Sequence, residues 1–179
     1  MEDIYTLEVA GLTRHLTLCP VNDKLDIAAF IMFGDVELTI SCAKVLLERV
    51  PEHDAIITAE SKGIPLAYEM SRQSGKKYIL ARKSKKLYMK KAVEVNVKSI
   101  TTENLQKLYL DSDDMEYLKG RRVLIVDDVI STGESLAALE QLVVQAGGKI
   151  AGKATVLAEG DAANREDIIF LSPLPLFFK

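Results

Sequence analysis

Short, continuous apolar runs are the feature that most constrains the fold of this chain. They occupy residues 55–59, 78–81 and 123–126, and charged or polar residues bound each of them. A strand that is apolar on both sides must be buried on both faces, which is typical of parallel sheets. Every run is far shorter than the ~18 residues that a membrane-spanning helix needs.

Segments with helical periodicity lie between and after these runs. The first helix is predicted to end before Pro51 and the second at Gly147-Gly148, where a left-handed C-cap suits glycine. Their predicted apolar residues are Val36, Ile40, Ala43, Leu47 and Val50 in the first helix and Leu136, Leu139, Val143 and Ala146 in the second. Strands that alternate with helices predict an α/β fold, in which a parallel sheet carries helices on both faces.

Residues 1–22 alternate between apolar and polar positions, which predicts a small β-rich hood added to the sheet. Residues 92–110 lack helical periodicity and are interpreted as a hairpin or long arm. The chain has no internal repeat and no linker rich in Pro, Gly or Ser. Its 179 residues therefore predict a single domain over 1–179.

Composition excludes several classes of function. The net charge of −3 gives no general attraction to nucleic acid or to an anionic membrane, so any affinity for phosphate must come from local placement. Two histidines and two cysteines are little material for a zinc cluster or a histidine-based triad. Met1-Glu2-Asp3 is not a basic segment before an apolar run, so we expect no secretory signal and a cytoplasmic protein.

The strongest functional signal is the thirteen-residue segment 123–135. A predicted buried strand ends in Asp127 and Asp128, and a short turn then leads into the second helix. Ligands bind beyond the carboxyl ends of strands in open parallel sheets, so both carboxylates are expected at the site. The turn supplies backbone N–H groups at a helix N-terminus, which favour a phosphate. Its residues are Ser131, Thr132, Gly133, Glu134 and Ser135.

Carboxylates beside such a turn would repel a bare polyphosphate. They suit a sugar phosphate, because they accept hydrogen bonds from ribose hydroxyls. Thr132 and Ser135 add hydroxyl donors, and Gly133 allows the backbone to approach closely. Adjacent aspartates alone would indicate only the end of a strand, and the turn alone only a helix cap. The combination predicts a site for a phosphorylated pentose.

Segment 123–135 resembles the motif that binds phosphoribosyl pyrophosphate (PRPP) in type I phosphoribosyltransferases. The chain is most similar to the adenine-specific members, and the resemblance extends over nearly its whole length. It implies that Asp127 and Asp128 contact the ribose hydroxyls and that residues 131–135 enclose the 5′-phosphate. Glu134 departs from the glycine that is usual there, so we expect its backbone to make the contact.

A second turn, Glu60-Ser61-Lys62-Gly63, follows the run 55–59 and also joins a strand to a helix. The resemblance implies that these residues bind pyrophosphate and that Lys62 is catalytic. An arginine is more usual at Lys62, and lysine keeps the charge but loses the bidentate geometry. The alternative interpretation is a helix start with a solvated lysine.

The basic run 82–91 contains six Lys or Arg in ten residues. It resembles the stretch that contacts pyrophosphate and shapes the dimer in adenine phosphoribosyltransferases, with Arg82, Lys83 and Lys86 at matching positions. Tyr88 replaces the usual proline. A solvated loop and a nucleic-acid contact are the alternatives, and the short run with one aromatic residue disfavours the latter.

The resemblance also implies that residues 83–111 form a mobile basic loop and flap over the site, with Glu103 as a candidate proton acceptor. It assigns base binding to Arg14 and Leu16 of the hood and to Ile130.

Xanthine-specific relatives have a lysine just after a glutamate near the C-terminal strand, where this chain has Glu159-Gly160. An adenine amino group needs an acceptor rather than that donor, so adenine is favoured over xanthine or another 6-oxopurine.

The resemblance thus implies a purine phosphoribosyltransferase of purine salvage that converts adenine and PRPP to AMP and pyrophosphate. Asp127, Asp128 and Lys62 are the expected catalytic residues, and Mg²⁺ is expected to bind with PRPP rather than at a separate metal site. A homodimer is expected, with neither nucleic acid nor membrane as a partner. The rival from another class is a non-catalytic, PRPP-sensing regulator. Such regulators usually add a DNA-binding module, whereas the predicted hood begins near the first residue.

Overall fold

A five-stranded parallel sheet forms the centre of the computed structural model, which describes residues 3–89, 91–98 and 105–179. Its strand order is β10-β9-β8-β4-β5, so β8 lies in the middle. The strands are β4 (Ala55–Ala59), β5 (Lys77–Ala81), β8 (Arg122–Ile130), β9 (Lys149–Glu159) and β10 (Ile169–Leu174). All the apolar runs singled out in the sequence are strands of this sheet, as predicted.

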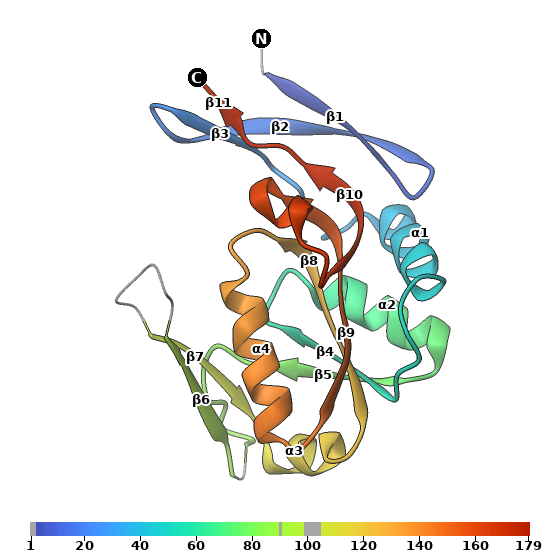
Figure 1. Ribbon diagram of the computed structural model, residues 1–179, viewed down its shortest axis with the longest axis vertical. Coiled ribbons are helices and arrows are strands. Elements are labelled where there is room, and N and C mark those ends of the chain that lie inside the picture. The colour runs from blue at the N-terminus through green and yellow to red at the C-terminus, as the bar shows by residue number, and fades with distance from the viewer. Residues whose placement is uncertain (1–2, 90, 99–104) are drawn as a thin grey trace.

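Helices cover both faces of the sheet, as the alternation of elements predicted (Figure 1). The helices α1 (Val36–Leu47) and α2 (Ile64–Ser74) pack with one set of strand side chains, including Ile56 and Leu124. The helices α3 (Ser112–Leu118) and α4 (Glu134–Gln145) pack with the alternate set, including Ile57 and Ile125. Both sets belong to the same strands because successive side chains of a strand point to opposite faces.

The buried face of α1 agrees with the predicted one only in part. Of the predicted residues, Ala43 is fully buried, and Leu47 and Val50 are partly buried against the core. Leu38, Cys42 and Leu46 are fully buried, whereas Val36 and Ile40 are exposed. Both sets of residues recur at helical spacing, because apolar residues occupy most positions of this helix. Which stripe is buried depends on how the helix lies on the sheet, and periodicity alone does not determine that. In α4, the predicted residues Leu136, Leu139 and Val143 are buried.

The hood is an antiparallel sheet of four strands, and it is larger than the predicted segment 1–22. It contains β1 (Ile4–Val9), β2 (Leu12–Asn22), β3 (Leu25–Ala28) and β11 (Phe177–Phe178). Strand β11 pairs with β3, so the last residues of the sequence complete a sheet begun by the first. Figure 1 shows the hood above the carboxyl ends of the central strands.

The expected arm is a hairpin of β6 (Val93–Lys98) and β7 (Leu105–Leu110). Leu108 and Leu110 of β7 pack in the same cluster as α4. The candidate proton acceptor Glu103 lies outside the described residues. The remaining helical element is the short 3₁₀ turn η1 (Gly160–Asn164). In the part of the chain that the structure describes, none of the helices is both long and apolar enough to span a membrane.

The two faces of α1 can be compared directly. Replacing Leu38 with Ala removes a fully buried side chain and should lower the free energy of unfolding by about 2–5 kcal/mol. Val36→Ala, on the exposed face of the same helix, should change it by less than about 0.5 kcal/mol. Urea unfolding followed by circular dichroism measures both. A loss for Val36→Ala that equals or exceeds the loss for Leu38→Ala would contradict the burial of Leu38 and the exposure of Val36.

Candidate functional site

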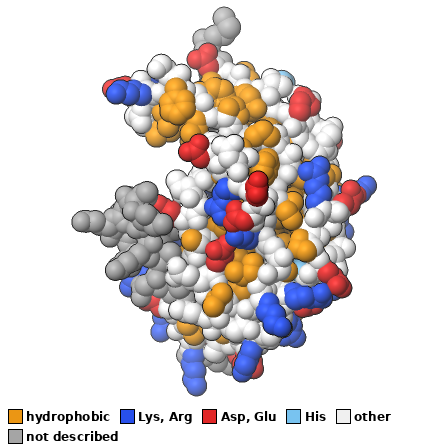
Figure 2. Space-filling model, in the orientation of Figure 1, with side chains coloured by type: hydrophobic (Ala, Val, Ile, Leu, Met, Phe, Trp, Pro, Cys, Tyr) orange, Lys and Arg blue, Asp and Glu red, His pale blue; other side chains and the backbone are white. Residues whose placement is uncertain are grey.

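A cavity of ≈ 470 Å³ opens where the central strands end beneath the hood. It is lined by residues 27–31, 59–62 and 127–129, and by Lys83, Ser131, Ser135, Glu159 and Leu174. Figure 2 shows this face hollowed between the hood and the body, with acidic and basic side chains gathered at the body side of the hollow. Its volume is in the range that accommodates a small organic ligand.

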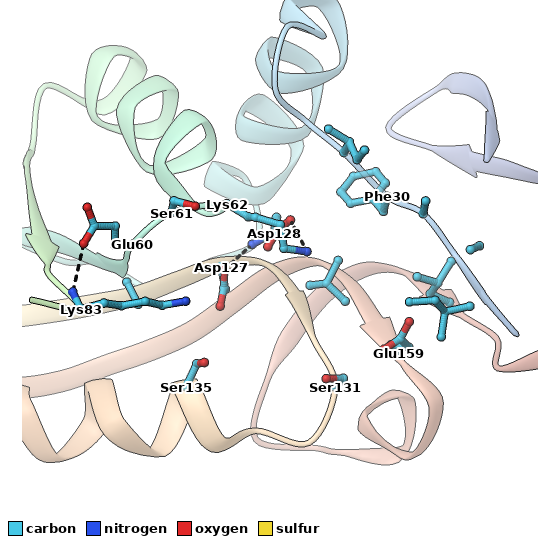
Figure 3. Close-up of a pocket in the computed structure, with 17 residues that line it drawn as sticks. Phe30, Glu60, Ser61, Lys62, Lys83, Asp127, Asp128, Ser131, Ser135 and Glu159 are labelled. Carbon is cyan, nitrogen blue, oxygen red and sulfur yellow. Dashed lines mark hydrogen bonds and ion pairs between the residues drawn. The ribbon is translucent and has the colours of Figure 1, made fainter. Parts of the chain in front are cut away.

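Strand β8 places the two predicted aspartates in this cavity (Figure 3). The strand extends to Ile130, so the aspartates lie within it rather than at its end as predicted. Asp128 is 2% exposed, and its Oδ2 has no hydrogen-bond partner. Lys62 Nζ lies 3.4 Å from that oxygen, an ion pair without hydrogen-bond geometry. The carboxylate of Asp128 is therefore almost completely removed from water, and Lys62 compensates its charge only in part.

Asp127 differs from Asp128 in its surroundings. Its Oδ1 accepts a hydrogen bond of 2.9 Å from the backbone N–H of Asp128. Burial, and then the adjacent charge of Asp128, raise the pKa of the Asp127 carboxyl well above its usual range, while Lys62 opposes the shift. Ionising both carboxyls therefore requires free energy, and a ligand that donates hydrogen bonds to them would reduce the amount required.

The turn that follows β8 forms a second, smaller cavity of ≈ 50 Å³ with the start of α4. Its lining residues include the whole predicted phosphate-binding set, Ser131, Thr132, Gly133, Glu134 and Ser135. Asp127, Val129, Ser131 and Ser135 also line the main cavity, so the two cavities adjoin. Gly133 is the N-cap of α4 and has a φ of 81°, which favours glycine. The structure thus brings the predicted set together at a helix N-terminus.

The turn 60–63 packs directly against β8. A Cβ on Gly63 would collide with Thr58 Oγ1 and lie 2.9 Å from Asp127 Oδ1, so only glycine fits there. Ser61 and Lys62 face the main cavity, as predicted. The side chain of Lys62 is 57% exposed, which leaves its ammonium accessible to a ligand.

Glu60 holds the basic run against this turn. Its carboxylate accepts hydrogen bonds of 3.0 Å from Arg82 Nη1 and from the backbone N–H of Lys83. The Lys83 N–H, and then Arg82, hold the pKa of the Glu60 carboxyl below its usual value despite burial. The side chain of Glu60 is therefore engaged with the basic run, and it also lines the main cavity.

The residues of the basic run are placed unequally. Lys83 lines the main cavity, whereas Arg82 and Lys86 do not. Arg82 is tied to Glu60, and its guanidinium lies 6.0 Å from the ring of Tyr88. Lys86 Nζ donates to Ser84 Oγ at 2.9 Å. Of these three, only Lys83 is in position to contact a ligand in the cavity as it stands.

The base-binding assignment needs correction. Arg14 forms ion pairs of 2.7 Å with Asp35 and 2.9 Å with Glu37, and Leu16 is buried in the core, so neither lines the cavity. Ile130 lines only the smaller cavity. The hood residues that do line the main cavity are 27–31, the apolar run Ile-Ala-Ala-Phe-Ile. This apolar run was the sequence signal for the wall of the cavity, but in the sequence it cannot be told apart from an ordinary strand.

Glu159 also lines the main cavity, at the end of β9. In the sequence, Glu159 is distinguished only by the absence of a following lysine. Because the carboxyl ends of neighbouring parallel strands meet at one edge, its position next to the aspartates follows from the pairing of β8 with β9.

The phosphoribosyl transferase domain family matches residues 39–172 of this chain. An adenine phosphoribosyltransferase of Cenarchaeum symbiosum is 38% identical over 117 residues, which cover 64% of this chain and 66% of that protein. A hypoxanthine/guanine phosphoribosyltransferase of Methanosalsum zhilinae is 32% identical over 145 residues, which cover 81% of this chain and 70% of that protein. The chain therefore matches only about two thirds of the length of these curated relatives.

A solved structure has the same fold. It is the adenine phosphoribosyltransferase of Trypanosoma brucei in complex with AMP, pyrophosphate and ribose-5-phosphate, and it matches with a TM-score of 0.67. The sequence identity is 19%, and the match covers 83% of this chain and 70% of that one. At this identity the likeness shows the fold alone, and it agrees with the predicted α/β sheet and hood.

The raised pKa of Asp127 has a consequence for stability. The folded chain holds this proton more tightly than the unfolded chain, so wild-type stability should fall as pH rises from about 4, the usual carboxyl pKa, to the raised value, and then level off. Asp127→Asn cannot ionise. Above this window it should raise the free energy of unfolding by more than about 1.4 kcal/mol, the equivalent of one pKa unit.

Urea unfolding at pH 5 and pH 8 measures this effect. The exposed Asp23 provides a matched control, since Asp23→Asn removes the same charge outside the cavity. A gain for Asp127→Asn that is no larger at pH 8 than at pH 5 would contradict the assignment of the raised pKa to this carboxyl.

Proposed function

Because the chain belongs to the phosphoribosyl transferase domain family, we propose that it is a purine phosphoribosyltransferase that transfers ribose 5-phosphate from PRPP to a purine base. One observation supports the proposal. Two adjoining cavities are lined in turn by residues 131–135 at the start of α4, by Asp127 and Asp128 of β8, and by residues 60–62 with Lys83. This order suits the 5′-phosphate, ribose and pyrophosphate of PRPP. The base would fill the remaining apolar part, below residues 27–31.

The 5′-phosphate of PRPP fits the turn 131–135. The free backbone N–H groups at the start of α4 and the positive end of the helix dipole favour a dianion there. Ser131 and Ser135 line both cavities and add hydroxyl donors. Glu134 takes part through its backbone in this proposal.

The ribose fits over β8, with its hydroxyls toward Asp127 and Asp128. An ionised carboxylate only accepts hydrogen bonds, and the Oδ2 of Asp128 has none. Two neighbouring hydroxyl groups would therefore satisfy the buried acceptors. Hydrogen bonds to charged groups contribute about 1.5–3 kcal/mol each. The same carboxylates would favour positive charge on the sugar as the reaction proceeds.

The pyrophosphate fits between the turn 60–63 and Lys83. In the reaction the bond from C1′ to the pyrophosphate oxygen breaks with both electrons leaving on that oxygen. A ring nitrogen of the base forms the new bond to C1′, and the proton that it loses is released to solvent. Lys62 and Lys83 stabilise the negative charge that develops on the leaving group, and Glu60 and Arg82 hold Lys83 in place.

Mg²⁺ is proposed to enter as part of the substrate. It usually binds one or two carboxylates together with substrate phosphates, and the unpartnered Oδ2 of Asp128 and the carboxylate of Asp127 are donors of the kind it prefers. When bound, the ion neutralises charge on the departing pyrophosphate.

Adenine is the base that we propose. One of the curated relatives described above is named for adenine and the other for hypoxanthine and guanine, so a 6-oxopurine is the alternative. The wall formed by residues 27–31 and Leu174 is apolar and suits the face of either kind of purine. The preference therefore depends on the polar groups at the edge of the ring. The expected homodimer and cytoplasmic location remain predictions.

Pyrophosphate release tests the function directly. The chain is incubated with PRPP, Mg²⁺ and adenine, hypoxanthine, guanine or xanthine in turn, and pyrophosphate is measured. We expect release with adenine to be the fastest. A PRPP-sensing regulator would instead bind PRPP, as seen by calorimetry, and release no pyrophosphate with any of the four bases, which would refute the enzymatic proposal.

A variant of Asp128 tests the role of the buried carboxylate. Because each 1.36 kcal/mol is tenfold in rate, Asp128→Ala should lower kcat/KM by about 10–100-fold or more. The control Asp23→Ala, on the exposed turn between β2 and β3, should keep wild-type activity. If Asp128→Ala turns over at a near-normal rate while remaining folded, Asp128 has no catalytic role.

A further inference from the structure

Glu159 is a charged group in the main cavity that the proposed reaction does not use. It is partly buried at the end of β9, and its side chain lines the cavity. Within the described ranges its carboxylate makes neither a hydrogen bond nor an ion pair, and its one electrostatic neighbour is Lys62. An acceptor that is partly removed from water and has no protein partner is a suitable contact for a ligand.

Its position lies on the side of the cavity away from the pyrophosphate-binding residues. In Figure 3, Glu159 and Phe30 lie on one side of the cavity, and Glu60 and Lys83 on the other, with Asp127 between them. The wall near Phe30 is apolar and belongs to residues 27–31. The structure therefore combines an apolar surface for a flat ring with one hydrogen-bond acceptor at its edge.

We propose that Glu159 determines the specificity for the base by accepting a hydrogen bond from the exocyclic amino group at position 6 of the purine. This inference rests on the proposed function, since it places the base in the part of the cavity left free by PRPP. It assigns the selectivity to a side chain at the end of β9, rather than to Arg14 and Leu16 of the hood.

The chemistry of the ring edge supports this choice. Adenine carries an amino group at position 6, which donates, whereas hypoxanthine carries an oxygen, which accepts. An ionised carboxylate only accepts, so it pairs with the amino group and is repelled by the oxygen. A site that is built to hydrogen-bond an N–H group discriminates strongly against an analogue that lacks it, because the buried acceptor is then left unpaired.

The protonation state of Glu159 provides a second readout. Burial raises the pKa of the Glu159 carboxyl, and the charge of Lys62 partly opposes this. A protonated carboxyl can donate to the 6-oxygen of hypoxanthine, so selectivity for the amino group should weaken as pH falls through this pKa. The other charged groups of the cavity are Lys62 and Glu60 beyond β4, Lys83 beyond β5, and Asp127 and Asp128 of β8, while residues 27–31 and Leu174 are uncharged.

Equilibrium binding of AMP and IMP isolates this edge of the base, because the two nucleotides share the phosphate and ribose. They differ at position 6, amino in AMP and oxygen in IMP, and at N1, which accepts in AMP and carries a hydrogen in IMP. The ratio of their dissociation constants thus cancels the contributions of the other charged groups. Wild type should prefer AMP at pH 8, and Glu159→Gln, whose amide both donates and accepts, should reduce that preference by about 10–100-fold. The control Asp161→Asn, an exposed carboxylate outside the cavity, should leave it unchanged.

Two results would overturn the inference. One is an AMP-to-IMP preference in Glu159→Gln that stays within about twofold of wild type, and the other is a wild type that binds IMP as tightly as AMP. The pH dependence needs no variant: the wild-type preference should weaken as pH is lowered from 8 into the range where the Glu159 carboxyl is protonated, and a profile that stays flat through that range also counts against the inference. Because binding is measured without turnover, the outcome is separate from the pyrophosphate assay, in which failure with every base would overturn the proposed function instead.

Discussion

The packing of the turn 60–63 against strand β8 determines the geometry of the whole cavity. Gly63 lies so close to Thr58 and Asp127 that no side chain fits, and this contact holds Lys62 within 3.4 Å of Asp128. From the same turn, Glu60 anchors Lys83 and Arg82. The turn 60–63 thus positions both Lys62 and Lys83 relative to the aspartates of β8.

The two aspartates lower the free energy of unfolding rather than raise it. Their carboxyls lie on the central strand, where burial disfavours charge, and Asp128 keeps an oxygen without a hydrogen-bond donor. The surrounding sheet, with helices packed on both faces, supplies the stability that holds them there. In the proposed function, a substrate with adjacent hydroxyls would donate hydrogen bonds to these carboxylates, and part of its binding free energy would come from those bonds.

The parts that could be predicted are those encoded by neighbouring residues. The strand β8, the turn 131–135 and the helix α4 are consecutive in the chain, so their chemistry was evident in the sequence. The predictions that failed concern residues whose positions depend on packing between segments that are far apart in the sequence. The buried stripe of α1 is chosen by the sheet, and Arg14 is drawn to Asp35 and Glu37 rather than to the cavity. Likewise residues 27–31 and Glu159 meet only because β3 and β9 end near each other in space.

The pairing of β3 with β11 joins segments from opposite ends of the sequence. Closing a loop between strands that are so far apart in the sequence costs conformational entropy, so such pairs are expected to form late in folding. On a ribosome, β3 could pair with β11 only after residues 177–178 had emerged. The roof of the cavity is therefore expected to be the last part assembled and, by the same reasoning, the first to open when the molecule is warmed.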